Sequence, residues 1–317
     1  MIDKFFKRSI EMLREEKGFW HKIYRVLIEF REEAISRVFR HLRSSGGVVK
    51  NILSAVTSLF DDKKENIERV MASQFKLIAE KEKDFLTGAL DVNMSKYPRT
   101  VKTVRDAPLQ SGEGSWVSKL FKPVRKRLRK SLQFSISRQG SIEEVVDRVF
   151  GKDTPKEIKI GNWRGNEFQG GVLSRLRSSL KTLVTTSFYE MVHKVRKFAF
   201  SRAEKVGSIR SVAVLDSRTT ETCRNYDGLI FEQKSLKPLG HGLKYIPTPR
   251  HWNCRSQHVP AEFDGKKIKP IPFEEWFDDL SNSAQDLLLG KVGGDLYREQ
   301  QSPLLNLLKR LSPKFLG

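Results

Sequence analysis

Apolar residues recur every three or four positions through the first part of the chain, a spacing that places them on one face of an α-helix. The first stripe is Trp20, Ile23, Leu27, Phe30, Ala34 and Val38. Two more stripes follow, Ile52, Val56 and Phe60, and then Ile67, Met71, Phe75 and Ile78. Ser44-Ser45-Gly46-Gly47 interrupts the pattern and predicts a turn. Two interpretations remain open: a small antiparallel bundle with a solvated charged face, or an amphipathic surface that docks on a larger partner.

Turn-forming residues then mark residues 91–118 as a connector. They lie at Tyr97-Pro98, at Ala107-Pro108 and in Ser111-Gly112-Glu113-Gly114-Ser115. We therefore expect two domains. The first is a helical docking region with its linker over residues 1–118, and the second covers residues 119–317.

The second half of the chain mixes helical and strand-like patterns. Ser141 followed by Glu143 and Glu144 predicts a helix start, and the helix should end near Gly151. Four glycines within residues 159–171 predict a loop, and a long helical pattern runs over residues 173–198. Short strands are expected at residues 211–215 and 229–231. The fold class is therefore α+β, with a helical N-terminal region followed by a C-terminal domain of a long helix, short strands and ordered loops.

Composition narrows the classes of protein. The 317 residues include 59 Lys and Arg against 38 Asp and Glu, a formal net charge of +21, which favours a polyanionic partner. The 20 Phe and 5 Trp exclude a disordered chain, and only two Cys exclude a disulfide scaffold. No stretch of about 20 apolar residues is free of charge, so we expect no membrane-spanning helix. The first residues lack the features of a secretory signal, so a reducing cytoplasm is expected.

The most basic stretch of the sequence runs from Lys119 to Arg138 and contains no acidic residue. Its cations are Lys119, Lys122, Arg125, Lys126, Arg127, Arg129, Lys130 and Arg138. Apolar residues between them predict an amphipathic helix. Three interpretations remain: contact with DNA phosphates that does not read sequence, an anionic bilayer surface, or a solvated face over a core stripe. Our prediction is DNA contact through this segment and through Arg196 and Lys197, near the end of the long helix.

Both cysteines of the chain fall between residues 216 and 258, among several histidines. Cys223, His251 and Cys254 are candidate ligands of a structural zinc ion, with His258 or His241 as the fourth. A Cys223–Cys254 disulfide and a pair of buried thiols are the other two interpretations. Zinc is thus the one candidate cofactor.

Around these ligands the residue types predict local structure. Asp216 follows a short strand and, like Thr219, is suited to cap the next turn. Asp227-Gly228 is a turn signal.

These runs resemble the phage Mu F-like family of minor head morphogenesis proteins. The family carries a Leu-Asp-x-Arg-Thr-(Thr/Ser)-x-x-Cys run and an Asp/Asn-Gly turn, which stand here at residues 215–223 and at Asp227-Gly228. It also carries a Pro-x-His-x-Asn-Cys-Arg-Ser run, which stands here at residues 249–256. Apart from the Cys and His, the candidate site residues among the matching motif positions are Asp216, Arg218, Thr219, Asp227, Gly228, Asn253 and Arg255. The long helix departs from the family, with Thr and Ser where the family has Arg and Glu.

The resemblance covers about residues 140–295. It implies a non-enzymatic virion protein at the portal vertex or head interior, acting in head assembly and in DNA packaging or delivery. The implied partners are the portal protein, the capsid protein and double-stranded DNA, with assembly in the host cytoplasm. Two alternatives remain. One is a metal-dependent nuclease or hydrolase using Asp216, Cys223, His251 and Cys254. The other is a membrane-active ejection protein.

Overall fold

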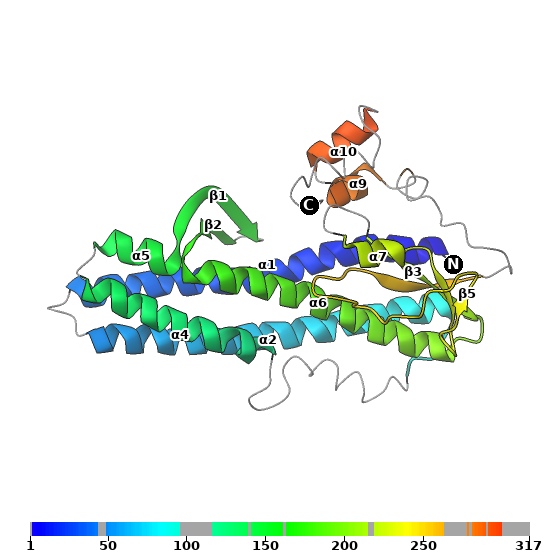
Figure 1. The fold of residues 1–317 in the computed structure, drawn as a ribbon, viewed down its shortest axis with the longest axis horizontal. Coiled ribbons are helices and arrows are strands. Elements are labelled where there is room, and N and C mark those ends of the chain that lie inside the picture. Colours follow the sequence, from blue (N-terminus) through cyan, green and yellow to red (C-terminus); the bar gives the residue numbers. More distant parts are fainter. Residues whose placement is uncertain are drawn as a thin grey trace. The chain divides into compact units, whose positions relative to one another are not determined.

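The amphipathic stripes form long helices. The computed structural model describes residues 2–43, 49–95, 116–138, 141–160, 163–214, 219–262, 278, 281–289 and 291–299. Its helices are α1 (Ile2–Arg43), α2 (Val49–Leu90), α4 (Trp116–Ser137), α5 (Ile142–Phe150), α6 (Gly171–Arg202), α7 (Glu221–Asn225), α9 (Asn282–Leu289) and α10 (Lys291–Arg298) (Figure 1). Its strands are β1 (Lys152–Ile160), β2 (Trp163–Gln169), β3 (Ser208–Val212), β4 (Ile230–Glu232), β5 (Pro238–Leu239) and β6 (Gln257–Ala261). The predicted α+β class is confirmed.

The chain divides into two units, each made from separate segments. Unit 1 contains Met1–Glu15, Glu80–Tyr97 and Phe188–Gly317, and unit 2 contains Glu16–Ala79 and Pro98–Ser187. Each unit combines segments from both sides of residue 118, so this grouping differs from the linear division that the connector predicts. The predicted turn at residues 44–47 and residues 96–115 of the predicted connector lie outside the described residues.

The core of unit 2 is built from the predicted stripes. Ring centroids of Phe30 and Phe60 lie 5.4 Å apart, and those of Phe60 and Phe121 lie 4.8 Å apart. Phe19 and Phe75 meet edge to face at 5.6 Å. Because such pairs bury large apolar areas, they link α1, α2 and α4 within the unit. The second and third predicted stripes belong to one continuous helix, α2.

The short helix α5 begins and ends where its sequence predicts. Ser141 and Glu144 form a reciprocal capping box, in which the Ser141 side chain accepts a hydrogen bond from the Glu144 backbone N–H. At the other end, Gly151 has a φ of 81°. Arg31 of α1 donates to the carbonyls of Phe150 and Gly151 at 3.0 and 2.6 Å. These bonds satisfy carbonyls that the end of a helix leaves without a partner.

The predicted loop at residues 159–171 is wrong. Most of it belongs to an antiparallel hairpin, in which Ile160 pairs with Trp163 and Ile158 pairs with Gly165. The glycines obscured a signal for a strand, because charged and apolar residue types alternate in the sequence from Glu157 to Ile160.

Unit 1 contains a four-stranded antiparallel sheet with the order β5-β4-β3-β6. Ile209 of β3 stands opposite both Phe231 of β4 and Pro260 of β6, and all three are buried. The strand predicted at residues 211–215 begins earlier, at Ser208. Across the described residues, no helix combines enough length with enough apolar character to cross a membrane.

Candidate functional site

Two short backbone features in unit 1 bring the cysteines together. Cys223 lies in α7, whose first turn is capped by Thr220: the Cys223 backbone N–H donates to the Thr220 hydroxyl at 3.4 Å. Cys254 closes a tight turn by donating its N–H to the carbonyl of His251 at 3.1 Å. Asn253 adopts a φ of 62° within that turn. The two motif runs that are separated in the sequence therefore meet at one place.

Cys223, His251 and Cys254 form a cluster that can hold a metal ion. Their ligand atoms all lie within 4.8 Å of one another. The two Sγ atoms are 3.7 Å apart, and Cys223 Sγ is 3.0 Å from His251 Nε2. Two thiolates on one tetrahedral zinc ion, each at about 2.3 Å from it, are about 3.8 Å apart. The sulfur separation therefore fits such an ion.

The backbone fixes which nitrogen of His251 faces the sulfur atoms. Its Nδ1 lies 2.8 Å from the backbone carbonyl of Trp252, and a carbonyl only accepts hydrogen bonds. Nδ1 must therefore carry the proton and donate. In the neutral ring this leaves the lone pair on Nε2, which lies 2.8 Å from the Thr220 hydroxyl. A carbonyl behind a ligating imidazole is a common second contact in metal sites.

The two thiols differ in their ease of ionisation. The hydrogen bond between them lowers the pKa of Cys254 to about 5. The same bond, together with burial, raises the pKa of Cys223 to about 12. The first proton is therefore lost from Cys254, and the Cys223 thiol then donates to the Cys254 thiolate.

His258 and His241, predicted as fourth ligands, do not belong to this cluster. The Nδ1 atom of His258 lies 3.4 Å from Nδ1 of His193 and 3.5 Å from the Thr248 hydroxyl. The Nε2 atom of His241 lies 2.8 Å from the carbonyl of Ile230. The prediction failed because sequence spacing carries no information on the direction in which a strand or loop presents its rings.

The buried pair of His193 and His258 is held neutral. Burial is the largest cause, and it lowers the pKa of His193 to about 3 and that of His258 well below its usual value. The cationic groups Arg196, Arg250 and Lys197 act in the same direction on His193. These neighbouring cations make the pair an unfavourable place for a metal ion.

The remaining motif residues support the backbone. Asp227 accepts a hydrogen bond from the Ala213 N–H at 2.8 Å, and burial raises the pKa of Asp227 to about 6. Gly228 has a φ of 77°, a backbone conformation that glycine adopts without steric cost. The Thr219 hydroxyl donates to the carbonyl of Val214.

Two motif residues, Asp216 and Arg218, lie outside the described residues, and Arg255 is buried. Among the described motif residues, Thr220, Cys223 and Cys254 lie beside His251.

The predicted basic helix is α4. Its buried face contains Val117, Phe121, Val124, Leu128 and Leu132. All eight predicted cations, Lys119, Lys122, Arg125, Lys126, Arg127, Arg129, Lys130 and Arg138, are exposed. Arg125 pairs with Asp61 at 2.9 Å, and Arg138 stacks on Phe134. Within the described part of the chain, the other six form no ion pair with an acidic side chain.

The prediction that Arg196 contacts DNA is wrong, because its side chain is buried. Its side chain is 0% exposed and donates to Glu82 at 2.6 Å and to Gln257 at 2.7 Å. Arg8 binds the other oxygen of the same carboxylate at 2.9 Å. The next residue, Lys197, is exposed. No local pattern marks Glu82 as the partner, because it lies on a different helix.

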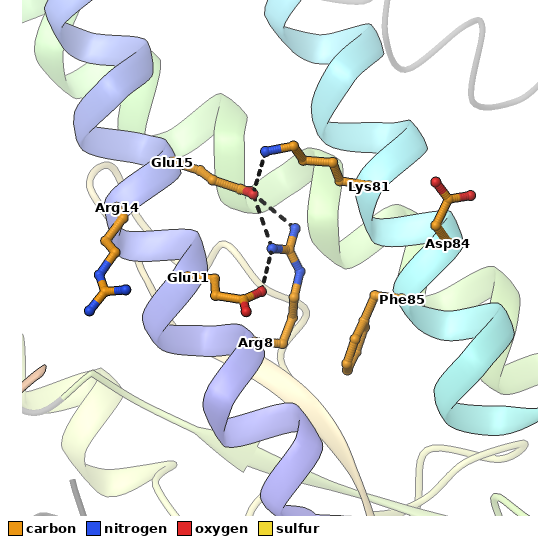
Figure 2. Close-up of a pocket in the computed structure, with 7 residues that line it drawn as sticks. All are labelled: Arg8, Glu11, Arg14, Glu15, Lys81, Asp84 and Phe85. Carbon is orange, nitrogen blue, oxygen red and sulfur yellow. Dashed lines mark hydrogen bonds and ion pairs between the residues drawn. The ribbon is translucent and has the colours of Figure 1, made fainter. Parts of the chain in front are cut away.

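A shallow recess of about 500 Å³ on unit 1 lies beside this network (Figure 2). Arg8, Glu15 and Lys81 line it and neutralise one another: Arg8 donates to Glu15 at 3.0 Å, and Lys81 does so at 2.9 Å. Glu11 also binds Arg8, at 3.2 Å (Figure 2). These mutual ion pairs favour a structural role for the recess.

Comparison with known proteins adds no relative: no protein-family model matches the chain, and neither a curated protein nor a solved structure is significantly similar to it.

Proposed function

We propose that this chain is a phage minor head protein of the virion interior or portal vertex, which acts in head assembly and in DNA packaging or delivery. In this role it contacts double-stranded DNA without sequence preference. The exposed, acid-free cationic face of α4 is the observation that carries the proposal. Six of its cations have no acidic partner within the described residues, so they are available to phosphates.

Charge of this kind binds DNA by releasing counterions, and it reads no base. A net charge of +21 also speeds the encounter with a polyanion. The two motif runs that resemble the Mu F-like family supply the context of a DNA-filled head. The portal and capsid proteins are the proposed protein partners, and their presence beside this chain can be tested by cross-linking intact virions.

The DNA contact is tested by the salt dependence of binding to random-sequence duplexes. The test variant replaces Lys122, Lys126, Arg129 and Lys130 with Gln. If these four side chains contact phosphates, the slope of log K against log salt should fall by up to about 4 in magnitude. The control carries the same charge change at four exposed lysines elsewhere, Lys4, Lys7, Lys234 and Lys237. Equal losses in both variants, or a flat salt dependence, would contradict the proposal.

We also infer that Cys223, His251 and Cys254 hold a zinc ion in a structural role. Thiolate and imidazole donors suit zinc, and the sulfur separation fits a tetrahedral ion. Elemental analysis should find one zinc per chain. It should be lost in Cys254→Ser and kept in His241→Ala, whose ring lies outside the cluster. Zinc-dependent DNA cleavage that disappears in His251→Ala would favour the nuclease alternative instead.

A further inference from the structure

We propose that Cys223 and Cys254 are a site of oxidative modification, at which peroxide joins the two sulfurs in a disulfide and releases the metal. This inference rests on the zinc centre proposed above. It gives the same two cysteines a second state, the disulfide, beside the zinc-bound state. In both states the α7 turn stays connected to the turn that follows His251.

The two sulfur atoms already lie close enough that forming the disulfide needs only a small movement. They lie 3.7 Å apart, and a disulfide bond is about 2.05 Å long. The two sulfur atoms therefore need to approach each other by less than the length of one disulfide bond. The backbone on each side is held by the Thr220 cap and by the hydrogen bond from Cys254 to His251.

The product of oxidation is fixed by the sequence. The chain contains only two cysteines, so no other intramolecular disulfide exists. Cys223 is 2% exposed and Cys254 is 1% exposed. A small oxidant therefore reaches the sulfurs more readily than a bulky one. The half-buried ring of His251 and the exposed Thr220 lie on the solvent side of Cys223.

The reaction balances in two steps. One thiolate sulfur attacks a peroxide oxygen, the O–O bond breaks, and hydroxide leaves with the electron pair. The second thiolate attacks the sulfenic sulfur, the S–S bond forms, and a second hydroxide leaves. The two sulfurs lose two electrons, the peroxide gains them, and Zn²⁺ departs with its oxidation state unchanged.

The proposed location of the protein gives this chemistry a setting. A virion protein is made in a reducing cytoplasm, where thiolates persist and bind metal. After release the particle meets oxidising surroundings, where disulfides persist. The zinc ion would then connect the two cysteine segments in the cytoplasm, and the disulfide would connect them in the released particle.

The experiment treats the zinc-loaded chain with hydrogen peroxide and follows released zinc with a chromophoric chelator. Intact-mass spectra of the same samples should lose two hydrogens per chain, with one disulfide formed per zinc released. Reduction should restore the thiols and the capacity to bind zinc. Cys223→Ser serves as the control for the mass change alone, because it keeps one thiol but cannot form the bond within one chain.

Other outcomes overturn the inference. Zinc release accompanied by added oxygen atoms and no cross-link would mean that the thiols are damaged and not paired. A zinc-bound chain that resists peroxide would overturn the oxidation alone and leave the proposed zinc centre standing. If the purified chain contains no zinc, both the proposed zinc centre and the proposed release of zinc by peroxide are refuted. DNA binding by α4 is measured separately and does not depend on either result.

Discussion

Glu82 and Arg196 form an ion pair with both side chains fully withdrawn from solvent, at 2.6 Å between Oε1 and Nε. The second oxygen of Glu82 binds Arg8, whose side chain is 5% exposed. One carboxylate therefore holds two buried guanidinium groups, from α1 and α6. Burying charge is costly unless each group is paired, so the three side chains depend on one another.

Replacing Glu82 with Gln should be strongly destabilising. The variant leaves the buried guanidinium of Arg196 without its anion and takes from Arg8 one of its three carboxylate partners. Removing one partner of a buried ion pair costs about 3–5 kcal/mol. Urea unfolding followed by circular dichroism measures the loss. Glu29→Gln is the control, because Glu29 forms an exposed i, i+4 pair with Arg25, and such pairs are worth about 0.3–0.5 kcal/mol. Similar losses in the two variants would contradict this account of the buried network.

Gly151→Ala should destabilise unit 2 more than Gly170→Ala. Both glycines have positive φ, 81° and 76°. A Cβ on Gly151 would lie 2.5 Å from the carbonyl oxygen of Gln169, whereas a Cβ on Gly170 would meet nothing within 4 Å. The Gly170 variant therefore isolates the conformational strain of about 1 kcal/mol, and the Gly151 variant adds a backbone clash. Thermal unfolding of the two proteins provides the comparison, and equal shifts would refute the close packing at Gly151.

Acid should destabilise unit 1 through its buried histidines. The pKa of His193 is lowered to about 3 by burial, while an unfolded histidine titrates near 6.5. As the pH falls below about 6.5, the unfolded chain takes up protons that the folded chain refuses, so stability decreases. One such histidine accounts for about 2 kcal/mol between pH 6.5 and 5.

The pH effect is measured as the difference in unfolding free energy between pH 7 and pH 5. His193→Gln should show a smaller difference than the parent, because it keeps a polar side chain near Thr248 but cannot be protonated. An unchanged difference would mean that His193 does not contribute to the acid sensitivity.

Removing the proposed zinc ion should loosen the segments that carry Cys223, His251 and Cys254. Metal binding contributes to folding because the donors meet only in the folded chain. After chelation, backbone amides of α7 and of the turn from His251 to Cys254 should exchange hydrogen faster. The capped helix α5 in unit 2 offers an internal reference whose exchange should not change. Uniform acceleration in both places would indicate global unfolding rather than a local role.

Local patterns were sufficient for much of the fold. Helical spacing predicted the stripe on α1, and the Ser141 and Glu144 pair predicted the start of α5, because both signals act within a few residues. The three cluster residues Cys223, His251 and Cys254 were also found, since they are concentrated in one stretch.

Long-range partners were not predictable in the same way. The fate of Arg196 was decided by Glu82, which lies 114 residues away in the chain. The exclusion of His258 depends on the register of β6 beside β3 and on its contact with His193. Residue spacing does not carry such information, because it arises only when separate elements pack.

The division of unit 1 between the two ends of the chain has a consequence for how the protein is made. Phe5 packs against Phe200 at 6.0 Å, and Ser9 accepts a hydrogen bond from Gln257 at 2.5 Å. Because synthesis runs from the N-terminal side, Ser9 leaves the ribosome 248 residues before Gln257, and Phe5 likewise leaves it well before Phe200. Until then Phe5 lacks its contact with Phe200 and Ser9 lacks its hydrogen bond from Gln257, and a truncated translation product lacking β6 would never form the second of these contacts.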